Sequence, residues 1–199
     1  MFIKPEGYDL VRDKTNGKTM LSDDRLIAIY NIGRRCRELD GDFAELGCCN
    51  GGVSFLLSSL IKPSHKLYAF DSFEGLPKPS KEDMESNKEG EFRSNYDEVV
   101  KYLSCNKVVV HKGWIEDTLI DIKDCTFSLI HIDLDLYAST KFSINFLWDK
   151  MVSNGYMIFD DYSFTGYTHG VKKAVDEFFG DLFRYNHYFM HPQLGVMKP

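Results

Sequence analysis

Short apolar segments recur along this chain, and stretches with helical periodicity separate them. Strands are predicted at DFAEL, KLYAF, residues 107–110, FSLIHID and YMIFDD, the last two of them buried. Two more strands, joined by a turn at Pro192, are predicted at the C-terminal end. Strands that alternate with helices form a parallel sheet with right-handed crossovers. The alternation predicts a single doubly wound, Rossmann-like α/β domain, with a mostly parallel seven-stranded sheet and an antiparallel C-terminal edge strand.

The helices are predicted from apolar residues at i, i+3, i+4 and i+7. Ser22 can cap the first helix, whose buried face would include Ile29, Ile32 and Cys36. Further helices are expected near residues 53–61, 96–103, 139–150 and 171–178.

The chain is expected to hold one main domain with an N-terminal attachment. Residues 6–18 form a polar opening, and residues 1–40 together are expected to be a helical segment or lid that packs on the core. Residues 41–199 would form the main domain. Within it, residues 77–95 have mixed charge and no periodicity, which predicts a long mobile loop.

Composition excludes several classes of function. With 24 basic and 30 acidic residues among 199, the net charge is −6, which argues against binding nucleic acid or an anionic membrane surface. No apolar run approaches the roughly 20 residues that span a bilayer, and the N-terminus lacks the apolar core of a signal peptide. The five cysteines show no CxxC pair, so we expect free thiols and a cytoplasmic location.

Two strand ends indicate a nucleoside-bearing cofactor, because ligands of open α/β sheets bind beyond the carboxyl ends of the strands. Glu45 precedes a glycine-rich turn, Gly47 to Gly52, which would let a ligand approach a helix N-terminus closely. A plain strand-to-helix connection is the alternative, since GxGxxG is not met. Asp71 lies about 20 residues later, where a carboxylate can accept both ribose hydroxyls; a cap or loop hydrogen bond is its alternative.

Four aspartates follow the next two buried strands: Asp133, Asp135, Asp160 and Asp161. Buried like charges are tolerated when a cation joins them or when some are protonated. Carboxylate oxygens suit Mg²⁺, Mn²⁺ or Ca²⁺. The alternative is that these residues cap the following helices. His131, inside the strand, is expected to be a core histidine.

Several motifs together resemble the macrocin O-methyltransferase family, over about Thr19 to Phe179. These are TMLSDDRL, GDFAELGCCNGG, YAFDSFEGLPKP, KGWIEDTL, HIDLDLYAST and MIFDDY followed by GVKKAVDEFF. The resemblance implies a class I methyltransferase domain over residues 41–199. It also implies that the enzyme depends on S-adenosylmethionine (SAM) and Mg²⁺ and methylates hydroxyl groups, several relatives acting on sugars of natural products.

The resemblance also implies roles for individual residues. The methionine part of SAM would lie against Glu45 and the glycine turn, its ribose against Asp71 and its adenine beside Trp114. The full set of implied cofactor-binding residues is Thr19, Met20, Glu45, Gly47, Gly51, Gly52, Asp71, Ser72, Gly113 and Trp114. The implied metal ligands are Asp133, Asp160 and Asp161.

The leading hypothesis is methyl transfer from SAM to a small-molecule hydroxyl acceptor, with Mg²⁺ or another divalent cation. A sugar or glycoside with vicinal hydroxyls is the expected acceptor, and the cation would hold both oxygens and lower the pKa of one. Asp133 and Asp135 are the expected catalytic residues, Asp135 as the candidate general base. Neither a nucleic acid nor a membrane is an expected partner, and a homo-oligomer stays open.

Two alternatives remain at this stage. The first alternative is a related oxidoreductase or hydroxylase-like enzyme with another nucleotide cofactor, because Asp71 would also suit NAD. The other is a catalytically silent cofactor-binding module.

Overall fold

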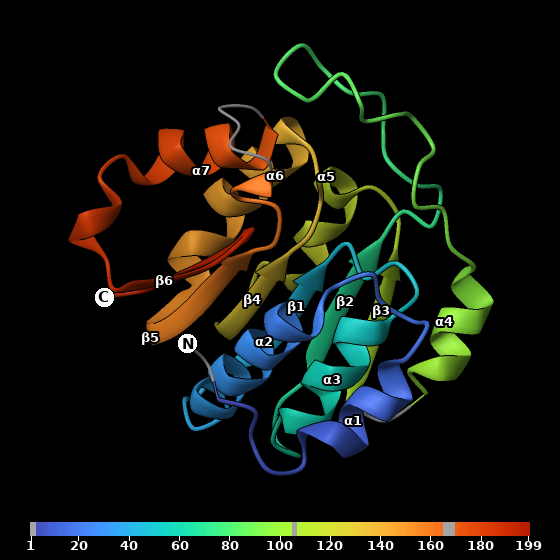
Figure 1. The fold of residues 1–199 in the computed structure, drawn as a ribbon, viewed down its shortest axis with the longest axis vertical. Helices are drawn as coiled ribbons and strands as arrows, with labels where there is room; N and C mark the ends of the chain where they lie inside the picture. Colours follow the sequence, from blue (N-terminus) through green and yellow to red (C-terminus); the bar gives the residue numbers. More distant parts are fainter. Residues whose placement is uncertain (1–2, 105–106, 165–169) are drawn as a thin grey trace.

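The computed structural model describes residues 3–104, 107–164 and 170–199. In this part of the chain, seven strands form one sheet in the order β3-β2-β1-β4-β5-β7-β6 (Figure 1). The strands are β1 Asp42–Leu46, β2 Leu67–Asp71, β3 Val108–Lys112, β4 Phe127–Ile132, β5 Met151–Phe159, β6 His187–Met190 and β7 Gln193–Met197. Strands β1 to β5 are parallel, and β7 pairs antiparallel with both β5 and β6. The predicted fold class is therefore confirmed.

Helices cover both faces of the sheet (Figure 1). They are α1 Tyr8–Thr15, α2 Asp23–Cys36, α3 Gly52–Leu60, α4 Tyr96–Tyr102, α5 Ile115–Thr118, α6 Tyr137–Leu147 and α7 Gly170–Phe179, with 3₁₀ turns at Leu119–Ile122, Trp148–Lys150 and Leu182–Arg184. Helices α1, α2 and α3 share one apolar cluster with one face of the sheet, and α5, α6 and α7 share another with the opposite face. No helix in the described residues is long and apolar enough to cross a membrane.

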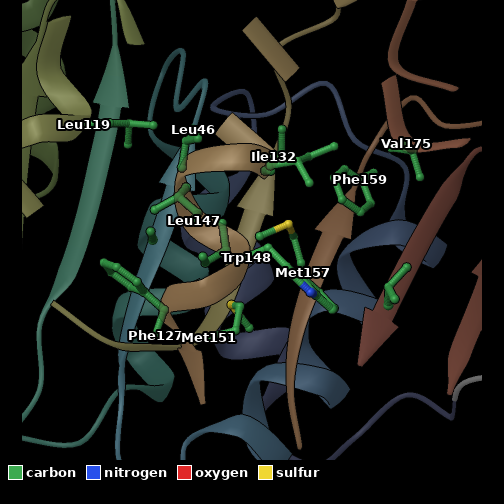
Figure 2. Packing of buried hydrophobic residues seen from close by; sticks show 14 of the residues in the cluster. Leu46, Leu119, Phe127, Ile132, Leu147, Trp148, Met151, Met157, Phe159 and Val175 are labelled. Atoms are coloured by element: carbon green, nitrogen blue, oxygen red, sulfur yellow. The ribbon is translucent and has the colours of Figure 1, made fainter. Parts of the chain in front are cut away.

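The two clusters follow from the alternation of side chains along each strand. Leu129 belongs to the cluster under α2 and α3, whereas its neighbour Ile130 belongs to the cluster under α6 and α7. Figure 2 shows the second cluster, in which Ile132 and Phe159 of the sheet lie with Leu147 and Trp148. Every residue of β4 is buried, as expected of a central strand covered on both faces.

The register of the sheet brings distant strand ends to one edge. Leu46 at the end of β1 pairs with Ile132 of β4, and Ile132 pairs with Phe159 of β5. The next residues along β4 and β5, Asp133 and Asp160, therefore leave the sheet side by side. This edge is where ligands of open α/β sheets bind.

Several element boundaries differ from the prediction. Residues 6–18, which read as a polar opening, contain α1, because Tyr8 is fully buried against Tyr30 with ring centroids 5.6 Å apart. Helix α6 begins at Tyr137 rather than at Ser139, since a carboxylate from a distant loop caps it. Ser22 is the N-cap residue of α2 as predicted, but its side chain makes no capping hydrogen bond.

Candidate active site

A cavity of about 430 Å³ opens at the carboxyl edge of the parallel strands. A smaller cavity of about 80 Å³ adjoins it beneath residues 17–21. The two share lining residues, among them Met20, Gly47 and Asp133, so they form one continuous site. The larger cavity falls in the size range of small-molecule and cofactor pockets.

The structure brings nearly all the sequence-predicted residues to this site. The larger cavity is lined by Met20, Gly47, Asp71, Ser72, Gly113, Trp114, Asp133, Asp135, Asp160 and Asp161. The smaller one adds Thr19, Glu45 and Gly52. Gly51 does not line either cavity; it is the N-cap of α3 and has a φ of +83°.

The glycine turn after β1 is packed too closely for side chains. A Cβ atom at Gly47 would lie 1.8 Å from the carbonyl oxygen of Asp133, and a Cβ at Gly52 would lie 2.6 Å from that of Lys18. The Gly52 amide donates to the same Lys18 oxygen at 3.0 Å. The segment that carries Thr19 and Met20 is thus fastened over the N-terminus of α3.

Asp71 ties together the turns that follow three strands. Its carboxylate accepts hydrogen bonds from the amides of Cys49, at 2.8 Å, and Phe73, at 2.6 Å. Both donors have positive φ, +45° and +61°. The Asp71 carbonyl accepts from Gly113 at 2.9 Å, which brings Trp114 to the same cavity. Burial raises the pKa of Asp71, partly offset by the two amide donors.

A fully buried imidazole separates two strand-end carboxylates. His131 Nδ1 lies 3.5 Å from Glu45 Oε1, and His131 Nε2 lies 4.0 Å from Asp160 Oδ1. Glu45 also accepts a hydrogen bond from the Ser54 hydroxyl of α3. His131 is therefore a core residue, as predicted, and its neighbours are these two acids.

Three carboxylates converge on the cavity: Asp133, Asp135 and Asp161 each bring an oxygen to within 4.8 Å of the others. Burial raises the pKa of Asp133, and repulsion from Asp160, Asp161 and Asp135 raises it further. Burial, followed by repulsion from Asp160 and Asp135, raises the pKa of Asp161 to about 8. Burial also raises the pKa of Asp135, to about 6. Asp135 has a φ of +60°, which turns the chain sharply between β4 and α6.

This donor set fits a hard divalent cation. Desolvated carboxylates that repel one another are stabilised either by protons or by a bound cation, and Mg²⁺ prefers oxygen ligands of this kind. Asp160, expected among the ligands, lies beside the cluster, but its oxygens are engaged elsewhere. One pairs with Arg25 and the other accepts from Gln193 Nε2 at 2.9 Å.

Arg25 is a site residue that sequence reasoning missed. It lines the larger cavity from α2 and is the only basic residue among the described residues that line that cavity; Lys18 lines the smaller one. A signal was present, because Arg25 lies four residues before Ile29 and so extends the predicted buried face of that helix. A charge on such a face needs a buried partner, which Asp160 provides.

Residues 77–95 contribute one wall of the cavity and are anchored at several points. Asp83, which is 7% exposed, accepts from the Tyr137 amide at the start of α6, at 2.6 Å. Glu82 pairs with Lys173, and its carbonyl accepts from the Gly170 amide at the start of α7, at 2.7 Å. The predicted mobility of this loop stays a prediction.

Comparison with known proteins gives one family. A family model described as Macrocin-O-methyltransferase (TylF) matches residues 6–184. The chain is 28% identical over 206 residues to a demethyldecarbamoylnovobiocin O-methyltransferase of Streptomyces niveus, covering 88% of this chain and 72% of that protein. It is 26% identical over 142 residues to an 8-demethyl-8-(2,3-dimethoxy-alpha-L-rhamnosyl)-tetracenomycin-C 4'-O-methyltransferase of Streptomyces olivaceus, covering 62% of this chain and 53% of that protein. The chain thus spans about half the length of the second relative.

A solved structure shares the fold. The O-methyltransferase NovP superposes with a TM-score of 0.79 at 22% sequence identity, over 96% of this chain and 88% of that chain. At this level of identity the likeness supports the Rossmann-like architecture.

Proposed function

The chain belongs to the macrocin O-methyltransferase family, and on that basis we propose that it transfers a methyl group from SAM to a hydroxyl of a sugar or glycoside, with a divalent cation. That it is an O-methyltransferase follows from the family match and the named relatives. The observation that carries the finer proposal is the convergence of Asp133, Asp135 and Asp161 beside a cavity that also contains Asp71 and the glycine turn.

The cofactor would be held by the residues that line the two cavities from β1, β2 and β3. Asp71 would accept the ribose hydroxyls with the lone pairs that its two amide donors leave free. Trp114, which is 37% exposed, offers an apolar surface for an adenine ring. Gly47 and Gly52 would let the methionine part of SAM lie against the backbone.

The chemistry of the acceptor would depend on the aspartates. When bound, SAM supplies an electrophilic methyl group, and a divalent cation stabilises negative charge on the acceptor oxygen. Asp133 and Asp161 would hold the cation, with either Asp135 or Asp160 as a third ligand. Asp135, if it is not a ligand, would take the acceptor hydroxyl proton at one of its carboxylate oxygens. Family relatives whose names include a rhamnosyl group or novobiocin support a sugar-bearing acceptor.

The cytoplasm is the proposed location, because Cys36, Cys48, Cys49 and Cys125 are free thiols, as in proteins of reducing compartments.

Calorimetry with SAM and NAD side by side tests the cofactor. We expect SAM, and its product S-adenosylhomocysteine (SAH), to bind with 1:1 stoichiometry and NAD not to bind. Tight binding of NAD with none of SAM would favour the oxidoreductase alternative. Binding of SAM with no transfer to any hydroxyl, in the presence of Mg²⁺, would favour a silent module.

The Asp161→Ala variant tests the dependence on metal. We expect it to lose Mg²⁺-dependent turnover and to keep its affinity for SAH, because Asp161 belongs to the carboxylate cluster whereas Asp71 would hold the ribose. The exposed Asp124→Asn variant is the matched control. Full activity of Asp161→Ala in EDTA would end the metal proposal.

A further inference from the structure

The connection between α1 and α2 covers the cofactor side of the site. Residues 17–21 of this connection, which we call the covering segment, all line the smaller cavity. Met20 and Leu21 line the larger cavity as well. The Met20 side chain is 67% exposed, so apolar packing of that side chain contributes little to holding the segment in place.

The N-terminal half of the covering segment is attached to α3 and α4. The Lys18 carbonyl accepts from the Gly52 amide at 3.0 Å, at the start of α3. The Tyr102 hydroxyl of α4 donates to the Lys14 carbonyl at 2.8 Å, and Lys18 Nζ lies 5.3 Å from the centre of the Tyr102 ring. These contacts hold the segment as far as Lys18.

The C-terminal half is attached to the acidic edge of the sheet through Arg25. One guanidinium nitrogen of Arg25, Nη1, pairs with the Asp160 carboxylate, and the other, Nη2, donates to the Met20 carbonyl at 3.4 Å. Asp160 is a rigid partner, because it is buried and also accepts from Gln193 Nε2 at 2.9 Å. Arg25 therefore joins a fixed carboxylate to the backbone of the covering segment.

This bridge depends on the shape of the arginine side chain as well as on its charge. A guanidinium is planar and donates hydrogen bonds in several fixed directions, whereas a lysine ammonium is a compact point charge. A lysine at position 25 would still neutralise Asp160, but it would not present a second nitrogen to Met20. The neutralising role and the bridging role of Arg25 can therefore be separated by substitution.

From these contacts we propose that Arg25 is a positioning residue for the cofactor: held by Asp160, it fixes the Met20 carbonyl and keeps the covering segment closed over SAM. The inference rests on the proposed function and adds to it a residue that acts on cofactor affinity through the covering segment. The affinity for the cofactor then depends on a contact that originates at the acidic edge.

Calorimetry of the intact protein with SAH, in EDTA, tests this role of Arg25. We expect Arg25→Lys to bind SAH about threefold to tenfold more weakly, the range that corresponds to the loss of one hydrogen bond. The same variant should keep most of the thermal stability that Arg25→Gln loses, because lysine retains the charge beside Asp160. Stability would thus follow the charge at position 25, and SAH affinity would follow the guanidinium.

Arg12→Lys is the matched control. Arg12 pairs with Asp23 in the same N-terminal region and is not among the described residues that line either cavity. We expect this variant to bind SAH with the affinity of the wild type.

Hydrogen exchange separates a local effect from a general loosening of the protein. The Leu21 amide, which donates to the Thr19 hydroxyl at 3.1 Å, should exchange faster in Arg25→Lys than in the wild type. The amide of Ile130, in the central strand β4, should exchange at the same rate in both.

The outcomes also separate this inference from the proposed function. Unchanged SAH affinity in Arg25→Lys, or an equal loss of affinity in Arg12→Lys, would overturn the role of Arg25 and leave the methyltransferase proposal standing. Faster exchange of Leu21 and Ile130 alike would overturn it too. Failure of the wild type to bind SAH would overturn the proposed cofactor and this inference together.

Discussion

Arg25 on α2 forms a buried ion pair with Asp160, the residue that follows β5, across 135 positions of sequence. The neighbouring Asp161 also lines the cavity, but its carboxylate joins those of Asp133 and Asp135. Two adjacent aspartates therefore have different environments. One is neutralised inside the protein, and the other is available to a cation.

Replacing Arg25 by Gln should destabilise the protein strongly. The change leaves Asp160 buried without its counter-ion, and breaking a buried pair in this way costs about 3–5 kcal/mol. Urea unfolding near neutral pH measures the free energy of unfolding. The control is Arg34→Gln, an exposed position on the same helix, which should change stability little. Equal stability of the two variants would show that Asp160 does not depend on Arg25.

The third metal ligand can be identified by comparing Asp135→Asn with Asp160→Asn. Because Asp135 belongs to the carboxylate cluster and Asp160 is engaged by Arg25 and Gln193, we expect Asp135→Asn to weaken Mn²⁺ binding more. Electron paramagnetic resonance of free Mn²⁺ measures the affinity, with Asp124→Asn as the control. The opposite order would support the ligand set implied by the family motif, and Asp160 would then have to leave Arg25 when the cation binds.

The stability of the metal-free protein should fall as the pH rises. Burial, followed by repulsion from Asp160 and Asp135, raises the pKa of Asp161 to about 8, from an ordinary aspartate value of 3.8. A carboxyl whose pKa is higher in the folded state disfavours folding once it must ionise, so stability is lost as the pH rises between these two values. Between about pH 6 and pH 8.5 we expect the Tm to drop by a few degrees.

Millimolar Mg²⁺ should remove much of that loss, because a bound cation favours the ionised carboxylates. Thermal unfolding by circular dichroism, with Mg²⁺ or with EDTA, measures both effects. The Asp161→Asn variant should show a flatter pH profile in EDTA. If the Tm in EDTA rises between pH 6 and pH 8.5 relative to the Tm with Mg²⁺, the predicted direction of the pH dependence is wrong.

Removing the Asp83 carboxylate should loosen the loop from α6. Asp83 accepts from the Tyr137 amide and from both the amide and the hydroxyl of Ser80. Loss of such a helix cap costs about 1–2 kcal/mol. In Asp83→Ala, hydrogen exchange at the Tyr137 amide should accelerate, and the affinity for the acceptor should fall. Glu85→Gln, an exposed change on the same loop, is the control; similar exchange rates in both variants would argue against the cap.

Much of the site could be predicted because it depends on short-range patterns. The burial of β4 and β5 predicted that the following aspartates would reach the sheet edge, and register then placed Asp133 beside Asp160. Asp71 was predicted at the same edge because it ends the parallel strand β2. In contrast, α1 was not predicted as a separate helix within the helical segment expected over residues 1–40, because its buried face has only Tyr8 and Thr15, too few residues to produce a periodic signal.

The sequence by itself determined the parallel sheet, the family, and the edge at which the acidic residues gather. Hydrophobic periodicity and the residues that follow each strand are local features of the sequence, so they can be interpreted without knowing which elements pack together. Only the tertiary structure decided that Asp160 pairs with Arg25, that Asp161 faces the cavity, and that residues 82 and 83 cap two helices. The ion pair and the two helix caps join residues 54 to 135 positions apart. Their strength depends on burial and direction, which exist only after the elements have packed.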